Sequence, residues 1–266
     1  MASAAPTNQL PLFYKQLEPL SSNLHATFKT HTADSAPFLA NAHAIPITVD
    51  EFVACQRYYP IVFSTGENPV PLALMGLNEG VNVFVDEQGK LLNDVYVPAY
   101  IRRYPFMLAR TRPDSDELSL CFDGESGLVR EAEEGNALFE DGKPTATTNA
   151  ILKFCEDFET SAHRTNAFVA DIKKEGLLID GEVSISSSTG QATPFIYRGF
   201  QMVSEEKVRD LRGDELRRMN QSGLLPLVMA HLFSLPLLRE IFARQVQQGK
   251  GPQVPEGTLA PAPANA

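Results

Sequence analysis

The sequence is poor in the residues that mark specialised protein classes. Its 266 residues include three cysteines, Cys55, Cys121 and Cys155, and no tryptophan. The cysteines form no CxxC pair, which excludes a disulfide-dense scaffold and favours a reducing compartment where thiols pack as small apolar side chains. Proline (19) and glycine (17) are too few for a low-complexity or collagen-like chain.

Positive charge is also scarce. The chain has 23 Lys and Arg against 33 Asp and Glu, which gives a net charge of −10. Because nucleic-acid phosphates need local positive charge, this balance argues against a nucleic-acid partner.

Local catalytic and metal-binding motifs are missing. The sequence has no GxSxG elbow, no P-loop, no GxGxxG after a strand, and no HxH, HExxH or HxxxH pair among its five histidines. We therefore expect no cofactor and no metal. His231, on an apolar helical stretch, is expected to be a hydrogen-bonded core residue.

No secretory signal is evident, because Met1–Asn8 has neither a basic residue nor an apolar run. We expect a cytoplasmic protein, with signal-independent export to the cell surface as the alternative. The longest apolar run, Gly223–Leu238, contains two prolines and is shorter than the roughly 20 residues that cross a bilayer. It predicts a buried helix and no transmembrane segment, and a membrane-surface segment is the alternative.

Three parts are predicted along the chain. Residues 1–12 form a flexible arm, residues 13–248 a single domain, and residues 249–266 a disordered tail rich in Pro and Ala. From about residue 40 to 145 short apolar runs alternate with turn sequences, so we expect strands joined as antiparallel hairpins. The predicted strands are Ala44–Ile47, Pro60–Thr65, Val70–Leu77, Val81–Val85, Leu91–Val97 and Glu117–Phe122.

Helical patterns dominate after residue 145. Apolar residues recur at spacings of three, four and seven in Thr147–Lys174, with Thr147 or Thr148 as the N-cap and Gly176 as the C-cap. A helix capped by Ser204 and ended by Gly223 follows a predicted strand pair, and Leu224–Gln247 forms the last helix. Strands followed by helices predict an α+β fold, a mostly antiparallel sheet in the N-terminal half packed against C-terminal helices.

Aromatic and arginine residues gather in two stretches, Arg57–Pro60 and Tyr96–Phe106. Such residues are typical of binding surfaces, because rings bury area at low entropic cost and a guanidinium offers a planar fork of donors to carboxylates. The predicted ligand-binding residues are Tyr58, Tyr59, Arg102, Arg103 and Tyr104. The alternative is that the rings lie in the core and the arginines pair with acidic loops.

Candidates for acid–base chemistry are weaker. His43 precedes a predicted strand and stands near Glu51, while Asp123 and Glu125 lie in Asp114–Asp141, which has ten carboxylates and only Arg130 as a base. No EF-hand spacing is present there, so a solvated acidic loop is the alternative.

Several stretches, in the same order and spacing, resemble the SapC family of bacterial proteins. These are Tyr59–Phe63, Gly76–Val85, Tyr96–Phe106, Leu138–Gly142 and Leu224–Leu238, within a resemblance that covers about residues 10 to 245. The resemblance implies a link to a bacterial surface layer. It also implies an accessory role in uptake or modification, with an outer-membrane receptor system or a halogenase as partner. It supplies no catalytic residues.

The first functional hypothesis is therefore a non-enzymatic accessory protein that binds a protein or peptide partner. The second is an enzyme, a hydrolase or modifying enzyme, with a dispersed acid–base site at His43, Asp123 and Glu125. The third is a structural or surface component that associates with membranes through Leu224–Leu238.

Overall fold

The computed structural model describes residues 10–32, 35–86, 89–92, 94–112, 114, 116–185 and 195–251. Most of the predicted arm and tail lies outside these residues. Strands predominate before residue 145 and helices after it, and every strand pairing in the described residues is antiparallel. The predicted α+β fold is confirmed.

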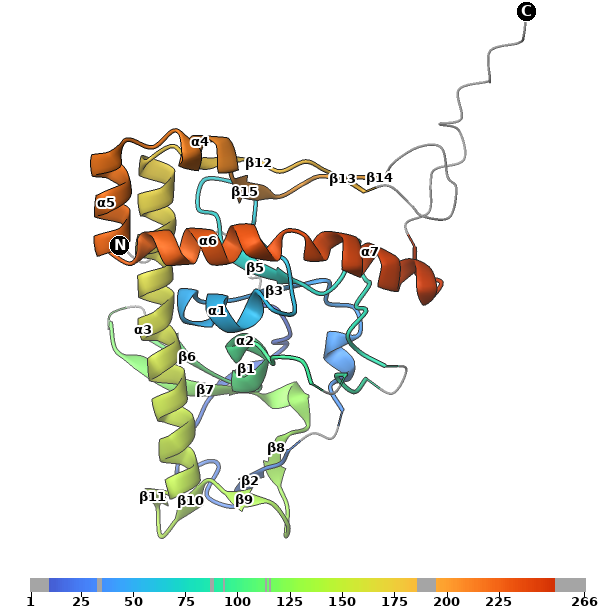
Figure 1. Ribbon diagram of the computed structural model, residues 1–266. Helices are drawn as coiled ribbons and strands as arrows, with labels where there is room; N and C mark the ends of the chain where they lie inside the picture. The colour runs from blue at the N-terminus through green and yellow to red at the C-terminus, as the bar shows by residue number, and fades with distance from the viewer. Residues whose placement is uncertain are drawn as a thin grey trace, which may run out of the picture.

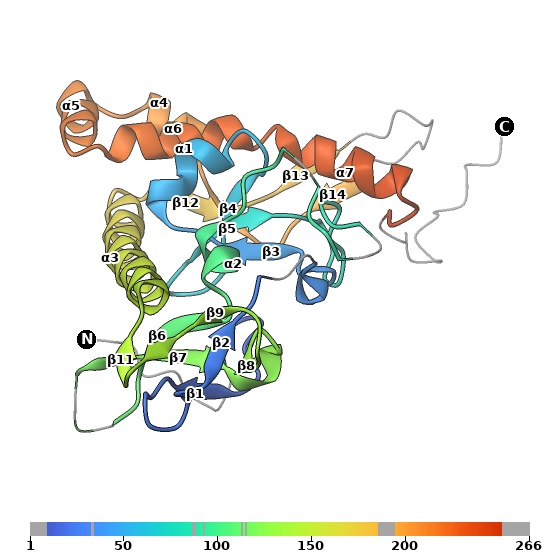
Figure 2. The ribbon, with the colours of Figure 1, turned by 90° about the horizontal axis from the view of Figure 1, so that it is seen from below.

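A five-stranded sheet forms the middle layer of the molecule, between the terminal helices and a group of smaller sheets (Figure 2). Its order is β12 (Leu178–Asp180), β15 (Gln201–Val203), β4 (Ile61–Phe63), β5 (Pro71–Leu74) and β3 (Ala44–Pro46). The predicted strand pair after Gly176 is also present, since β12 pairs with β15 and β13 (Val183–Ile185) with β14 (Phe195–Tyr197).

The smaller sheets enclose a second, smaller core. One has the order β1 (Leu17–Pro19), β7 (Leu118–Asp123) and β6 (Phe106–Arg110), and another has β8 (Val129–Glu131), β2 (Phe28–Thr30) and β9 (Asn136–Ala137). A third pairs β10 (Phe139–Glu140) with β11 (Lys143–Pro144). The buried members of this core are Phe106, Leu108, Phe122, Val129, Leu138 and Cys155.

Helix α3 (Ala146–Lys174) connects the two cores and runs along one side of the molecule (Figure 1). Its first half contributes Cys155 to the small core, and its second half contributes Phe168 and Ile172 to the large one. The predicted C-cap is confirmed, because Gly176 follows the helix with a φ of 68°. The predicted N-cap is wrong. Thr145 caps the helix, and its hydroxyl oxygen accepts from the Thr148 amide.

Two segments predicted as strands are not strands. Within Val81–Val85 and Leu91–Val97 the described residues form only a single bridge, between Val85 and Leu91. In the first of these segments the buried Asn82 amide donates to the Leu39 and Ala42 carbonyls and accepts from the Phe84 amide. These bonds hold Val81–Val85 in a bent conformation instead of a regular ladder.

The C-terminal helices are shorter than predicted. The helix capped by Ser204 divides into α4 (Glu205–Arg209) and α5 (Gly213–Gln221), and the last helix into α6 (Leu224–Ser234) and α7 (Leu237–Gln247). Pro236 lacks the amide that would continue α6, and at α5 the Glu215 carboxylate accepts from the Arg212 amide and starts a new helix. Two further helices, α1 (Phe52–Cys55) and α2 (Ala99–Arg103), were not predicted.

Helix α6 packs against β4, β15 and α1. By length and hydropathy alone the stretch Leu224–Gln247 could cross a membrane, a test that core helices of soluble proteins also pass. The side of α6 that faces the sheet is hydrogen-bonded to it. The His231 imidazole accepts from the Val203 amide and bonds the Ile61 carbonyl, and the Ser234 hydroxyl accepts from the Ile61 amide. The expected role of His231 as a hydrogen-bonded core residue is confirmed.

Candidate functional site

Arg102, near the end of α2, is the exposed arginine of the predicted binding surface. Its Nε donates to the Val97 carbonyl at 3.0 Å and its Nη2 to the Tyr96 hydroxyl at 3.3 Å. Its guanidinium carbon lies 5.2 Å from the Phe154 ring centroid and 5.8 Å from that of Tyr96. Among the described residues Nη1 has no hydrogen-bond partner, so the side chain is held in place with a donor still available.

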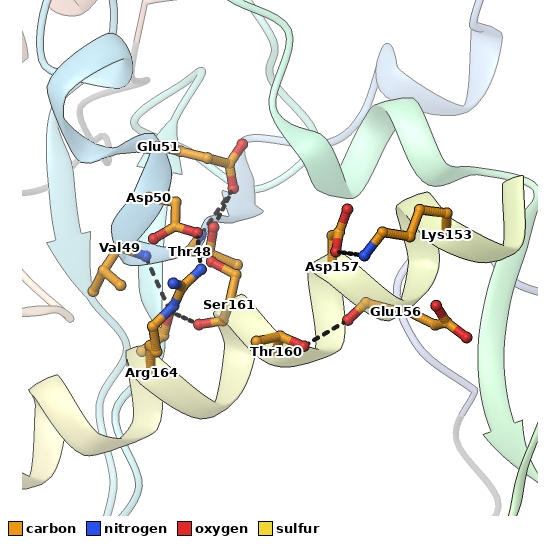
Figure 3. A network of polar contacts seen from close by, with 11 residues as sticks. Thr48, Val49, Asp50, Glu51, Lys153, Glu156, Asp157, Thr160, Ser161 and Arg164 are labelled. Carbon is orange, nitrogen blue, oxygen red and sulfur yellow. Dashed lines mark hydrogen bonds and ion pairs between the residues drawn. The ribbon is translucent and has the colours of Figure 1, made fainter. Parts of the chain in front are cut away.

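The buried carboxylate of Glu51 fixes the position of Tyr96 and of the first turn of α2. Glu51 accepts from the Tyr96 hydroxyl at 3.1 Å and from the Ala99 amide at 2.6 Å, which anchors the first turn of α2. Its other oxygen accepts from the amide and the hydroxyl of Thr48 (Figure 3). Burial, and secondarily the Glu51 charge, raises the pKa of Tyr96 to about 12, so the Tyr96 hydroxyl remains a donor to Glu51 and an acceptor for Arg102.

The turn that carries Glu51 is fixed to α3. The Val49 amide donates to the Thr165 hydroxyl at 3.0 Å, and Asp50 pairs with Arg164 (Figure 3). Glu51, Tyr96 and Arg102 therefore form a continuous chain of polar contacts that begins on a rigid base. Sequence analysis placed Glu51 near His43 and missed this role.

Arg103, which was predicted to belong to the same binding surface as Arg102, is buried. Its side chain is 6% exposed, and its guanidinium carbon lies 4.5 Å from the Tyr100 ring centroid and 4.1 Å from that of Phe158. Nη1 lies 3.6 Å from a Glu159 carboxylate oxygen, and Nε has no partner among the described residues. Burial raises the pKa of Glu159, and the charge of Arg103 opposes that rise.

A pocket of about 410 Å³ opens beside the two arginines. It lies between the α2–β6 segment and the first half of α3, which Figure 1 shows running past α2. Its walls are mostly apolar, with guanidinium groups at one side. The lining residues are Arg102, Arg103, Phe106, Thr147, Ala150, Ile151, Phe154 and Cys155. This chemistry suits a group that joins an apolar body to a carboxylate.

Tyr96 connects this pocket to the other predicted aromatic group. A second pocket, of about 400 Å³, is lined by Ala54, Arg57, Tyr58, Asp94, Val95 and Tyr96. Tyr59 lies fully buried beneath it, and its hydroxyl donates to the Tyr96 carbonyl at 2.7 Å. Tyr96 thus lines a pocket with Tyr58 and contacts Arg102, while Tyr59 supports it from the core.

Tyr104 points into a different environment. Its hydroxyl donates to Asp123 at 2.8 Å, and its ring packs against Phe13, Tyr14 and Phe38. Asp123 is fully buried and also accepts from the backbone amide of Gln16 at 2.9 Å. With its oxygens occupied by protein donors, Asp123 has the environment of a structural carboxylate.

The three acid–base candidates do not meet in a hydrogen-bonded group. His43 precedes β3 in the large sheet, Asp123 ends β7 in a small sheet, and Glu125 is exposed in the turn that follows. No hydrogen bond or ion pair in the described residues joins His43 to either carboxylate. Burial lowers the pKa of His43, and the charge of Glu79 opposes that shift. Within the same ranges, no three His, Cys, Asp or Glu side chains are grouped to hold a metal ion.

A family model described as SapC matches residues 20–241. The chain belongs to the SapC family. The match includes both pockets and all the residues that line them, which confirms the resemblance seen in the sequence. No curated protein and no solved structure matches the chain.

Sequence analysis of this SapC-family chain missed three residues that shape the site: Glu51, Tyr96 as a connecting residue, and Phe154. Tyr96 belongs to the aromatic–arginine stretch Tyr96–Phe106, so the composition of that stretch indicated a functional role for it. Nothing in the sequence indicated a functional role for Phe154, since it is one of many apolar residues in the α3 segment.

Proposed function

We propose that this SapC-family protein is a non-enzymatic accessory protein that binds a partner protein or peptide through the pocket beside Arg102. The group bound there combines an apolar side chain with a carboxylate. The observation that supports this is the pre-oriented guanidinium of Arg102 at the side of an apolar pocket.

Pre-orientation makes Arg102 an effective binding residue. Two hydrogen bonds and two ring contacts already restrict its side chain, so less conformational entropy is lost when a ligand is bound. Aromatic and arginine residues are also the types that supply most binding energy at protein interfaces. The buried Arg103 adds positive potential behind the pocket.

The partner and the compartment are part of the same proposal. We propose that the protein acts in the cytoplasm, with export to the cell surface as the alternative. The resemblance that names an outer-membrane receptor system and a halogenase makes these the first partners to test. An acidic segment of such a partner would complement the arginine side of the pocket.

The proposal is tested with an array of short peptides that pair Asp or Glu with Leu or Phe, probed with the full-length protein. We expect Arg102→Ala to weaken binding of the best peptide by about 10-fold or more, because a hydrogen bond to a charged group contributes about 1.5–3 kcal/mol. The matched control is Arg130→Ala, another exposed arginine, on β8. Equal binding by the wild type and Arg102→Ala, or selection of peptides without a carboxylate, would contradict the proposal.

A further inference from the structure

Both arginines lie at the same end of the pocket beside Arg102. The pocket wall on α3 spans residues 147–155, which is about 12 Å of helix. The Arg102 guanidinium lies over the Phe154 ring at the end of this wall. The Arg103 guanidinium lies over the Phe158 ring, one turn further along α3. The positive charge of the pocket is therefore gathered at the end away from the N-terminus of α3.

Two donors at this end have no partner within the described residues. Arg102 is held by the Val97 carbonyl and the Tyr96 hydroxyl, yet its Nη1 remains unpaired. The side chain of Arg103 is 6% exposed, and its buried Nε is also unpaired. A buried N–H group without an acceptor is destabilising. A carboxylate at this end of the pocket offers the acceptors that both arginines lack.

The acidic side chains nearby leave this end of the pocket positive. Glu159 lies 3.6 Å from Nη1 of Arg103, so one carboxylate stands against two guanidinium groups. Asp157, also on α3, is paired with Lys153, and Glu156 is exposed. None of these three acids is among the residues that line the pocket. The balance favours a ligand group with a single negative charge.

The remainder of the pocket is mostly apolar and is short. Ala150 and Ile151 line it between Thr147 and the arginine end, and Phe106 lines it from β6. An extended chain rises about 3.3 Å per residue, so a wall of about 12 Å accommodates about three residues. A partner chain would therefore be bound here by a short extended segment.

The end of a chain fits this pocket better than an acidic residue inside a chain. Neighbouring side chains of an extended segment point to opposite sides, so an internal Asp or Glu and the apolar residue next to it cannot both enter. An acidic residue two positions away points to the same side, but its chain would have to continue past Arg103. That path is blocked, because Arg103 is stacked between the Tyr100 and Phe158 rings. A C-terminal residue, in contrast, carries its side chain and its carboxylate on the same carbon atom.

We propose that the pocket binds the C-terminal residue of a partner chain, an apolar residue such as Leu or Phe with a free carboxylate. This inference rests on the proposed function and names the part of the partner that is bound. The carboxylate accepts from Nη1 of Arg102 and Nε of Arg103, and the apolar side chain packs on Ile151. The preceding residues of the partner leave the pocket past Thr147.

Paired peptides test the role of the carboxylate. Short peptides that end in Leu, Phe, Val or Met are made once with a free C-terminal carboxylate and once with a C-terminal amide, each labelled at the N-terminus. Fluorescence anisotropy measures their binding to the full-length protein. We expect the best free acid to bind about 10-fold or more tightly than its amide, because hydrogen bonds to a charged acceptor are the strong ones.

Equal binding of the acid and the amide would overturn this inference. The proposed function would then still stand if peptides with an internal Asp or Glu bind and lose affinity in Arg102→Ala. Loss of all peptide binding would refute both. N-acetyl-leucine is a further probe, and if it binds as tightly as the best peptide, the pocket belongs to a small carboxylic acid and the choice of a partner chain is wrong.

Ala150→Phe tests the apolar part of the pocket. Ala150 is exposed, so the added ring occupies the pocket without entering the core. We expect this variant to weaken binding of the free-acid peptide by about 10-fold or more. The matched control is Asn149→Phe, which places the same ring on a neighbouring exposed position that does not line the pocket. It should bind as the wild type does, and equal effects of the two variants would overturn the assignment.

Discussion

Acid should destabilise this protein through His231 before it disrupts most of the carboxylate interactions. The imidazole lies between two strands, where Nε2 accepts from the Val203 amide at 3.0 Å and Nδ1 lies 2.8 Å from the Ile61 carbonyl. Only the neutral ring with its proton on Nδ1 satisfies both groups. A second proton would remove the acceptor for Val203 and place a charge in the core.

The size of the effect follows from the pKa. Burial lowers the pKa of His231 to about 4, from an ordinary value of 6.5. Between these values the unfolded chain binds a proton that the folded chain does not, so the stabilising contribution is complete above about pH 6.5 and is lost as the pH falls toward 4. Because one pKa unit corresponds to about 1.4 kcal/mol, the loss reaches about 2–3 kcal/mol at about pH 4.5.

The assay is urea unfolding followed by circular dichroism, since the chain has no tryptophan for fluorescence. The reference is His231→Gln, which can donate and accept but does not titrate. Carboxylates titrate in both proteins, so the difference between their unfolding free energies isolates His231. We expect the advantage of the wild type to shrink by about 2–3 kcal/mol from about pH 7.5 to about pH 4.5.

A difference that stays constant over this range would refute the reasoning. If His231→Gln does not fold, the titration of the His231 ring in the wild type, followed by NMR, provides the same test. A ring that becomes protonated near pH 6.5 in the folded protein would contradict the neutral buried state.

Three other contacts are tested by substitution. Thr145→Ala should lower the unfolding free energy by about 1 kcal/mol in urea titrations, because it removes the α3 cap, while Thr147→Ala should have a smaller effect. Glu51→Gln replaces one acceptor oxygen by an amide that cannot accept, so we expect a loss of about 1–3 kcal/mol and weaker peptide binding in the array experiment. Arg103→Ala should cost about 2–4 kcal/mol, because it removes the cation between two rings and leaves Glu159 without its partner. A change below about 0.5 kcal/mol in any of the three would show that its contact is not stabilising.

Features controlled by neighbouring residues were predictable from the sequence. The period of α3, the glycine after it and the Ser204 cap all depend on contacts within a few residues. His231 was also predictable in kind, because a lone histidine in an apolar helix must find partners for its two ring nitrogens. Its partners, the backbone groups of Val203 and Ile61, could not be predicted from the sequence.

The candidate site was predictable in composition but not in arrangement. Arg102 and Arg103 are adjacent in the sequence, yet one is exposed at a pocket and the other is buried between Tyr100 and Phe158. Adjacent residues on a short helix point in different directions, and only the position of α3 decides which of them is covered. The same applies to Tyr104, which turns toward Asp123 instead of the pocket.

The predominance of strands before residue 145 and of helices after it, the acidic character and the family resemblance were determined by the sequence alone, because they depend on local periodicity, composition and the order of motifs along the chain. The tertiary structure decided which groups meet. Glu51 lies 45 residues before Tyr96, and Ile61 lies 170 residues before His231, so neither pair has a local signal. Such contacts form only when separate elements pack, since packing selects which polar groups are buried and must therefore find a partner.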